Sequence, residues 1–513
     1  MAPCSPLGVT SSLLVMDMSD MDKRYDWFSV LESSELELWV NKLSSEVILA
    51  YEKAHLSSGS NKSKRDAEYT RISRHIISAL YSATHARSKK KLWVSFPAAA
   101  GNYAIPSATK ASVDTTKIPY SYRRFCNVRD QLLKLEWIEV QSEVTNVRHK
   151  SMYPKGKLLH ALKRMDLKWL KVAPRRAELL VELSDVERYG NGKPIRNKKF
   201  KTKKKSLSVP NTPIVQAYRS KLFEQNATYT EHCISLSVSD DQLKELEEAM
   251  ANEDSKYRYL DFSQVQMTRI FARGSMSKGG RFYQPWWQNI LSSYRKYILI
   301  DGESTVECDF TAMSLNQLYA KEGIPCPKGE DPYDLGLSDW LGQKDERRKP
   351  IKTFVNALLN DEDSIYKLTA QQSSIVDGLT HDELLEKLYS KHPKIKHSIE
   401  QKVGLKLHFE DSCIADVIML FCNKDGIVVL PVHDSFIVIK RHEEQLMQIM
   451  TKAFQGQYSS SDFVAIDVEQ GSEQELTQES IMGKYLSSWQ SSCVVEVGIG
   501  RDDVRSHPLA HPN

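Results

Sequence analysis

The sequence predicts an α+β protein in two parts, a basic N-terminal third and a longer acidic remainder. Apolar residues at helical spacing alternate along the chain with short β-rich runs, which indicates a mixture of helices and strands. The length of 513 residues allows about two to four domains. Residues 51–210 carry 35 basic and 13 acidic side chains, whereas residues 211–513 carry 32 basic and 45 acidic ones. Because a local excess of positive charge attracts polyanions, we expect the basic third to contact nucleic acid.

Residues 1–65 are predicted to form an acidic, helical N-terminal segment. The first 50 residues carry 8 acidic and 3 basic side chains. Between Leu31 and Ala50 the apolar residues recur at near-helical spacing, which predicts a helix there. These apolar positions are Leu36, Val40, Leu43 and Val47.

Residues 66–189 are predicted to form a basic, DNA-binding domain. We expect helices over 67–86 and 120–135 and strands over 92–96 and 137–141, followed by a basic segment. A helix, a strand and a basic loop in this order are typical of a winged helix. That interpretation places Arg123, Arg124 and Arg129 on the exposed, DNA-contacting side of the second helix. The alternative is a small α+β domain with a basic face and no groove-reading role.

Residues 190–212 are predicted to be a basic linker. Lys193 to Lys205 contains eight basic residues and no acidic one, with Gly190 and Gly192 before it and Pro210 and Pro213 after it. A flexible polycation of this kind can grip a phosphate backbone without sequence preference, or serve only as a tether. We expect a globular domain over 213–487 and a tail over 488–513.

Composition also excludes several classes of protein. No apolar run approaches the ~18 residues that a membrane span needs. The eight cysteines form no CxxC pair and no Cys/His cluster. We therefore expect no membrane partner, no disulfide framework and no structural zinc site, and we interpret the chain as a cytoplasmic protein.

Two acidic positions lie where β-rich runs end. Asp309 closes a run that begins near Thr305 and precedes a predicted helix over 312–321. An acid between a strand and a helix projects into a cleft rather than into the core. Further on, two β-rich runs flank His433 and Asp434, which predicts a hairpin with the acid at its turn.

A third segment predicts a helix with one polar face. Pro350 suits the first turn of this helix. Its polar residues are four apart and therefore share a face, which points at a ligand or at solvent. They are Arg348, Lys352, Asn356 and Asn360.

Taken together, these segments supply the groups needed for nucleotidyl transfer. Two separated carboxylates can hold two Mg²⁺ ions about 4 Å apart. Mg²⁺ is usually bound by one or two carboxylates together with substrate phosphates. A helix face of arginine and lysine would neutralise the charge that develops on a triphosphate.

The same segments, in the same order, resemble the motifs of family A DNA polymerases and of the related phage-type single-subunit RNA polymerases. Asp309-Phe310 resembles motif A, the helix from Arg348 to Asn360 resembles motif B, and His433-Asp434 resembles motif C. Two further segments resemble those that precede motifs A and C, and the resemblance covers roughly residues 265–445. These segments are Gly280-Arg281 with Gln288-Asn289 and Arg295, and the helix from Asp411 to Ile418.

This resemblance implies a right-hand fold of palm, fingers and thumb, and a template-dependent polymerase without proofreading. It implies that two Mg²⁺ ions are held at Asp309, Phe310 and Asp434, and that Lys352 takes part in catalysis. Its implied partners are a DNA template, a primer and a dNTP. Nucleotide binding is implied for Arg348, Lys352, Asn356, Asn360 and Ser314, and primer or template contact for Arg281, Gln288, Asn289 and His433.

Three departures from the family pattern leave the choice of sugar open. Ser314 stands where family A has a glutamate that blocks a ribose 2′-hydroxyl, and Asn360 replaces an aromatic residue. Ser435 stands where family A DNA polymerases usually have glutamate, and phage-type RNA polymerases resemble this chain in carrying serine there. DNA synthesis is the leading prediction, and RNA polymerase or primase is the alternative. A non-catalytic replication initiator or regulator is a further alternative, and the compact plan suggests a phage, plasmid or integrated element.

Overall fold

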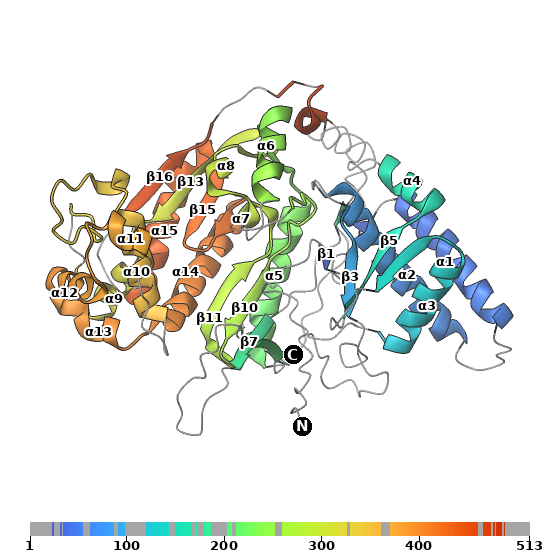
Figure 1. Cartoon of the computed structure of the whole chain (residues 1–513), viewed down its shortest axis with the longest axis horizontal. Coiled ribbons are helices and arrows are strands. Elements are labelled where there is room, and N and C mark those ends of the chain that lie inside the picture. The colour runs from blue at the N-terminus through green and yellow to red at the C-terminus, as the bar shows by residue number, and fades with distance from the viewer. Residues whose placement is uncertain are drawn as a thin grey trace.

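The computed structural model describes three packed regions of mixed helix and sheet, which confirms the predicted α+β class (Figure 1). Within the described part of the chain, no helix combines the length and the apolar character that a membrane span requires. The described residues are 23–24, 31–32, 34–54, 62–86, 91–97, 120–142, 149–165, 171–172, 179–185, 203–207, 212–251, 259–325, 329–360, 370–459, 465–472, 476–477, 479–484 and 487.

The N-terminal lobe packs four helices against a small sheet. The sheet has the order β1-β3-β5-β4, with β5 antiparallel to both of its neighbours. A pair of two-residue strands, β2 and β6, lies apart from it. The elements are β1 (Lys23–Arg24), β2 (Leu31–Glu32), α1 (Ser34–Ala54), α2 (Lys62–His85), β3 (Val94–Pro97), α3 (Tyr122–Lys134), β4 (Ile138–Ser142), β5 (His149–Pro154), α4 (Gly156–Arg164) and β6 (Lys171–Val172).

Helix α1 belongs to the core of this lobe. Its apolar stripe, including Leu36 and Leu43, is fully buried in one cluster with Ile72 and Ile76 of α2. The helices and strands predicted here are confirmed to within a few residues. Burial of the apolar stripe places α1 in the same core as α2. The division of the chain at residue 65 stays a prediction.

The central region is built on a sheet of order β14-β15-β13-β12-β9, with β16 paired to the other edge of β13. Buried Val306, Cys308 and Phe310 alternate along β13 with more exposed residues, as a strand with one face on a core requires. Helices α14 and α15 share the same hydrophobic core. The elements are α5 (Pro213–Thr230), β9 (Ile234–Leu236), α6 (Asp240–Met250), α7 (Trp286–Asn289), α8 (Ser292–Arg295), β12 (Ile298–Ile300), β13 (Glu303–Phe310), α14 (Gly404–Lys424), β14 (Leu430–Val432), β15 (Ser435–Ile439), α15 (Glu443–Tyr458) and β16 (Ile466–Gln470).

A second sheet joins the basic third to the central region. Its order is β11-β10-β7-β8, formed by β7 (Leu179–Asp185), β8 (Lys203–Leu207), β10 (Thr268–Ala272) and β11 (Ser275–Tyr283). Strand β7 is parallel to β10, and β8 is antiparallel to β7. Strands β7 and β8 lie on either side of the predicted boundary at residue 189 and together complete this sheet. The boundaries at residues 189 and 212 stay predictions. The rest of the Lys193–Lys205 tract lies outside the described residues. The predicted tail over 488–513 also lies outside them, whereas Ser487 just before it is described.

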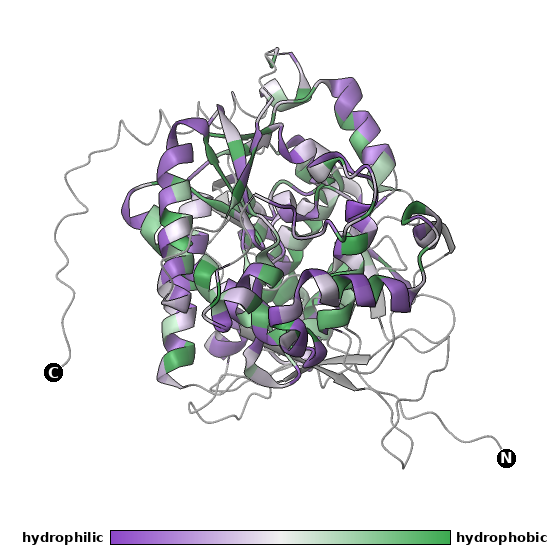
Figure 2. Ribbon diagram, turned by 90° about the vertical axis from the view of Figure 1, so that its left-hand side faces the viewer, coloured by the Kyte–Doolittle hydropathy of each residue, from purple (hydrophilic) through white to green (hydrophobic). Residues whose placement is uncertain are grey.

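A helical lobe is inserted between β13 and β14. Its helices bury a separate core that includes Leu315, Phe354 and Leu388. Figure 2 looks onto this lobe and shows helices with a hydrophilic and a hydrophobic side, as expected where one face packs on a core. The helices are α9 (Met313–Lys321), α10 (Arg348–Asn360), α11 (Ala370–Ile375), α12 (His381–Lys391) and α13 (Lys396–Glu400).

Candidate active site

Asp309 and Asp434 lie next to one another at the end of two paired strands. Asp309 is opposite Ser435 in the β13–β15 ladder, and Asp434 occupies the two-residue turn between β14 and β15. The Phe310 amide donates to the Asp434 carbonyl oxygen at 3.3 Å. His433 begins the turn with a φ of 64°, as tight two-residue hairpins require at a central position. The predicted hairpin with an acid at its turn is confirmed.

The two carboxylates form a partly buried pair of like charges. Burial raises the pKa of Asp309 to about 7, and the charge of Asp434 adds to the rise, while Lys352 opposes it. Glu307 and Asp467 raise it further. A site of this kind favours a cation, because neutralisation removes both the desolvation cost and the repulsion.

Two further carboxylates near Asp309 were missed by the sequence reasoning. Asp467 faces Asp309 across the β13–β16 ladder and accepts from Gln343 Nε2 at 3.3 Å. Glu307 precedes Asp309 by two residues, so the two share a face of β13. That period of two could have revealed Glu307, whereas Asp467 lies beyond the segment in which the family resemblance was recognised.

The Ser435 side chain contacts Glu307 on the paired strand β13. Its hydroxyl donates to Glu307 Oε1 at 2.6 Å, and Arg295 Nε donates to Glu307 Oε2 at 2.8 Å. The motif residue Arg295 is thus joined to the motif residue Ser435 through Glu307. This chain of contacts ties β15 to β13 and to α8 directly beside Asp309.

Helix α10 presents its cations toward the carboxylate pair. Its buried side carries Ile351, Phe354, Val355 and Leu359, which leaves the predicted polar face outside the core. The charge of Lys352 acts on Asp309. Pro350 lies in the first turn, as predicted.

Arg348 is held in place by two residues that precede α10. Its Nε donates to Asp331 Oδ2 at 2.8 Å, and its guanidinium lies 5.0 Å from the ring centre of Tyr333. Burial raises the pKa of Tyr333; Arg348 opposes the rise, and Asp434 and Asp309 contribute to it. Tyr333 therefore lies between Arg348 and the carboxylate pair. The sequence motifs did not predict a role for Asp331 or Tyr333.

The two positions linked to sugar choice differ in their surroundings. Ser314 is partly exposed in the first turn of α9. Asn360 Nδ2 donates to the Asn356 carbonyl at 2.8 Å, and its Oδ1 is buried without a hydrogen bond from any described residue. A Cβ on Gly404 would lie 2.3 Å from that oxygen, so only glycine lets α14 begin this close to Asn360. Nucleotide binding by these residues stays a prediction.

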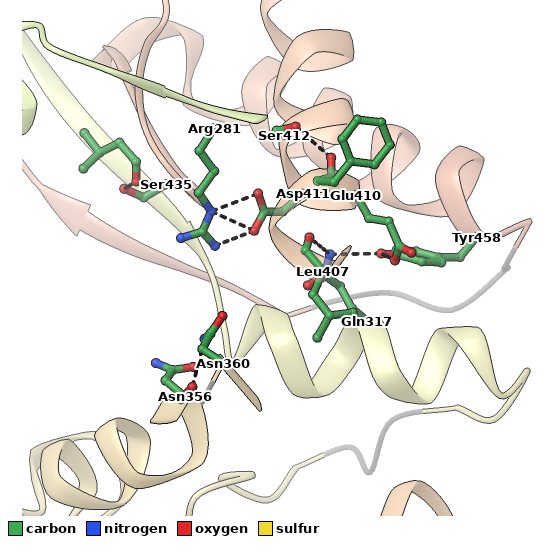
Figure 3. A network of polar contacts seen from close by, with 12 residues as sticks. Arg281, Gln317, Asn356, Asn360, Leu407, Glu410, Asp411, Ser412, Ser435 and Tyr458 are labelled. Carbon is green, nitrogen blue, oxygen red and sulfur yellow. Dashed lines mark hydrogen bonds and ion pairs between the residues drawn. The ribbon is translucent and has the colours of Figure 1, made fainter. Parts of the chain in front are cut away.

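Arg281 forms an ion pair with a carboxylate of the same chain. Its Nε lies 3.0 Å from both oxygens of the Asp411 carboxylate, and a second guanidinium nitrogen pairs with the same group (Figure 3). Burial raises the pKa of Asp411 to about 7 although Arg281 opposes the rise. Gly280 has a φ of 84°, and a Cβ there would meet Ser412 Oγ at 2.9 Å, which explains the glycine before Arg281.

The other predicted primer and template residues of this region also contact the protein. Gln288 Nε2 donates to the Pro431 carbonyl at 2.8 Å, and Asn289 Nδ2 donates to the Gln284 carbonyl at 2.9 Å. The His433 ring lies edge-on to Tyr283, with 5.1 Å between centroids. These contacts hold α7 and β11 against the hairpin that carries Asp434. A role of these side chains in binding primer remains a prediction.

A polar network fixes α14 against α9 and α15 (Figure 3). The Tyr458 hydroxyl donates to Glu410 Oε2 at 2.9 Å, and Gln317 Nε2 donates to that hydroxyl at 3.0 Å. Gln317 Nε2 also lies 3.1 Å from the Leu407 carbonyl. Because Asp411 follows Glu410, this network also sets the position of the Arg281–Asp411 pair.

In the N-terminal lobe, only one of the three predicted DNA-contacting arginines is exposed. Arg123 is exposed on α3. Arg124 is paired with Glu68 of α2. Arg129 donates to Asp130 at 2.8 Å, and its side chain is only 11% exposed. The Arg124 side chain stays partly exposed beside Glu68, whereas Arg129 is largely enclosed by the packing of α3. DNA contact by these arginines stays a prediction.

Comparison with known proteins gives little further information. No family model matches the chain, and no curated protein matches it. Among solved structures, the POL domain of Pol1 from M. smegmatis, in complex with DNA primer-template and dNTP, is similar at 11% identity with a TM-score of 0.27. The similarity covers 56% of this chain and spans 57% of that structure. The interpretation of the site therefore depends on its own geometry.

The buried Arg281–Asp411 pair leads to a prediction about stability. Arg281→Ala should lower the free energy of unfolding by about 3–5 kcal/mol, because it leaves the Asp411 carboxylate buried without its partner. Arg281→Met combined with Asp411→Leu should recover most of the loss. Urea denaturation measures both, with Arg441→Ala as the control because its pair with Glu303 is half exposed. Equal losses for the single and the double variant would contradict this account.

Proposed function

We propose that the chain is a template-dependent nucleic-acid polymerase, most simply a DNA polymerase without proofreading. The observation that carries the proposal is the partly buried Asp309–Asp434 pair facing Lys352 on the polar side of α10. Paired carboxylates opposite a cationic helix face suit the transfer of a nucleotidyl group from a triphosphate. We assign the central sheet to the palm and the helical lobe to the fingers.

The carboxylate pair suits two Mg²⁺ ions. Asp309 and Asp434 supply hard oxygen ligands, and their mutual repulsion in a partly buried setting would be relieved by divalent cations. The backbone carbonyl of Phe310 adds a ligand of the same kind. Among the described residues, no group of three or more His, Cys, Asp or Glu side chains is arranged to hold a metal. Two carboxylates plus substrate phosphates are the set that Mg²⁺ accepts. When bound, the ions would activate a primer hydroxyl and stabilise charge on the transferring phosphate.

The chain's own residues orient the triphosphate and neutralise it. Arg348 is fixed by Asp331 and Tyr333, so its guanidinium is pre-organised at one end of the carboxylate pair. Lys352, one turn further along α10, would meet the phosphates that leave as pyrophosphate and supply a proton to them. The primer hydroxyl forms the new bond to the α-phosphate, and the bond to the β-phosphate oxygen breaks.

The N-terminal lobe is proposed to bind the nucleic acid. The β4–β5 hairpin follows α3 directly, which is the arrangement of a helix and its wing. The winged-helix interpretation is retained on that ground, and its alternative is a basic α+β lobe without groove reading.

Primer extension on a primed DNA template tests the proposal. The purified full-length chain, with Mg²⁺ and all four dNTPs, should lengthen a labelled primer according to the template sequence. A parallel reaction with NTPs decides between DNA synthesis and the alternative of RNA polymerase or primase. Tight DNA binding without extension under either condition would favour the non-catalytic alternative, which the presence of both Asp309 and Asp434 disfavours.

Ser314 leads to a prediction about the sugar. A glutamate at this partly exposed position in the first turn of α9 would crowd a ribose 2′-hydroxyl. We expect the wild type to incorporate NTPs detectably, and Ser314→Glu to suppress NTP use over dNTP use by about ten- to a hundredfold. Competition between mixed dNTP and NTP pools measures the ratio. A wild type that is strictly selective for dNTPs, and is unchanged by Ser314→Glu, would refute the role of this position.

A further inference from the structure

We propose that an open groove between α1 and α4 binds single-stranded nucleic acid. The groove has a volume of about 820 Å³ and is lined by Trp39 of α1 and by Lys157, His160 and Arg164 of α4. An aromatic ring beside a row of cations is the combination with which proteins bind single strands, because bases stack on the ring while phosphates follow the charges. The groove belongs to the N-terminal lobe and is separate from the carboxylate pair.

Helix α4 carries several exposed cations close together, whereas the exposed cations of α3, Arg123 and Lys134, lie at its opposite ends. Lys157, His160, Lys163 and Arg164 are all exposed, while Leu158 and Leu162 are buried in the core. Arg164 Nη1 lies 3.2 Å from His160 Nε2. No acidic side chain of the described residues forms an ion pair with Lys157, Lys163 or Arg164.

The contrast with α3 favours α4 as the helix that meets a single strand. On α3, Arg124 is paired with Glu68 and Arg129 with Asp130, so their charge is already neutralised within the lobe. Counterion release, which drives binding to a phosphate backbone, requires cations that are free to replace those counterions. On α4 such cations follow one another along a helix that borders an open groove.

Trp39 is fixed in place as a stacking platform. Its ring lies edge-on to Trp137, with 5.8 Å between centroids, and the Lys42 ammonium is 4.8 Å from the ring centre. The Trp137 indole is itself anchored, since its Nε1 donates to Glu46 at 2.8 Å. A ring that is already positioned loses little side-chain entropy when a base stacks on it.

The charges also set the path of the strand. Glu35 lines the α1 side of the groove and repels phosphate, so the backbone must follow α4 while a base turns toward Trp39. In a duplex the bases are paired and stacked inside, so they cannot reach the ring. A preference for single strands over duplex follows.

Anisotropy of a labelled oligothymidylate, titrated with the full-length chain in the absence of nucleotides, tests the proposal. Lys157→Gln combined with Arg164→Gln should weaken binding at least about tenfold and lower the slope of log K against log salt by about 0.7 per lost contact. The matched control is Lys53→Gln combined with Lys64→Gln, which removes the same charge from exposed positions on α1 and α2. We expect the control to change affinity less than about twofold.

A third variant separates stacking from charge. Trp39→Leu keeps an apolar side chain but removes the ring, and should weaken single-strand binding about tenfold with little change in the salt slope. Circular dichroism confirms that each variant is folded. Equal losses for the control pair and the α4 pair would overturn the proposal, as would an unchanged affinity in the α4 pair or equal competition by duplex DNA. Since no nucleotide is present, the outcome does not depend on polymerase activity.

Discussion

Asp434→Asn should abolish nucleotide incorporation, with a loss of at least about a thousandfold in kcat, or about 4 kcal/mol of transition-state stabilisation. Asparagine keeps the size of the side chain but removes the charge that a divalent cation needs. Asp309→Asn should have the same effect, because both carboxylates belong to one partly buried pair. Single-nucleotide extension under saturating template, with template affinity measured separately, gives the result.

The same substitution should not destabilise the protein. Burial raises the pKa of Asp309 to about 7, and the charge of Asp434 adds to the rise, so removal of the Asp434 charge relieves repulsion. We expect the Tm of Asp434→Asn to equal or exceed that of the wild type, and template affinity to be nearly unchanged. This separates loss of chemistry from loss of folding.

Asp467→Asn is the matched control for this prediction. Asp467 faces Asp309 across the β13–β16 ladder, but its residue is exposed, whereas Asp309 is partly enclosed. We expect it to retain activity within about tenfold, the scale of one weak electrostatic contribution. Near-wild-type extension by Asp434→Asn, or equal loss in Asp467→Asn, would show that the reacting carboxylates were wrongly assigned.

The sequence could predict the elements around this site because their patterns are strong and local. The β-rich runs on either side of His433 fold into a two-residue hairpin, and the four-residue spacing from Arg348 to Asn360 produces one polar helix face. These features depend on neighbours within about ten residues, which periodicity captures.

Contacts between residues distant along the chain could not be predicted in this way. Arg124 meets Glu68 across two helices, and Arg281 meets Asp411 across 130 positions of sequence. The sequence patterns predicted a boundary at residue 65, whereas the buried stripe of α1 lies in one core with α2 on the other side of that position. Charge describes the surface of a lobe, and domains are defined by shared hydrophobic cores.

Lys352→Ala should lower kcat by about a hundred- to a thousandfold while template binding is unchanged. Lys352 is the cation of α10 whose charge acts on Asp309, and it lies one turn beyond Arg348. In Lys352→Ala, a triphosphate placed between the carboxylate pair and α10 would lack a counter-charge. The leaving pyrophosphate would also lack a proton donor. Single-turnover kinetics separate the effect on chemistry from the effect on nucleotide binding.

Lys349 provides the matched control on the same helix. It is exposed, whereas Lys352 is partly buried and its charge acts on Asp309, so Lys349→Ala removes the same charge and the same side chain from a solvent-screened position. We expect its kcat to stay within about twofold of the wild type, since an exposed charge is well screened. Arg348→Lys should lie between the two variants, because a point charge cannot reproduce the guanidinium's contact with Asp331 and its position over Tyr333. Equal kinetics for Lys352→Ala and Lys349→Ala would mean that the polar face of α10 meets solvent rather than a nucleotide.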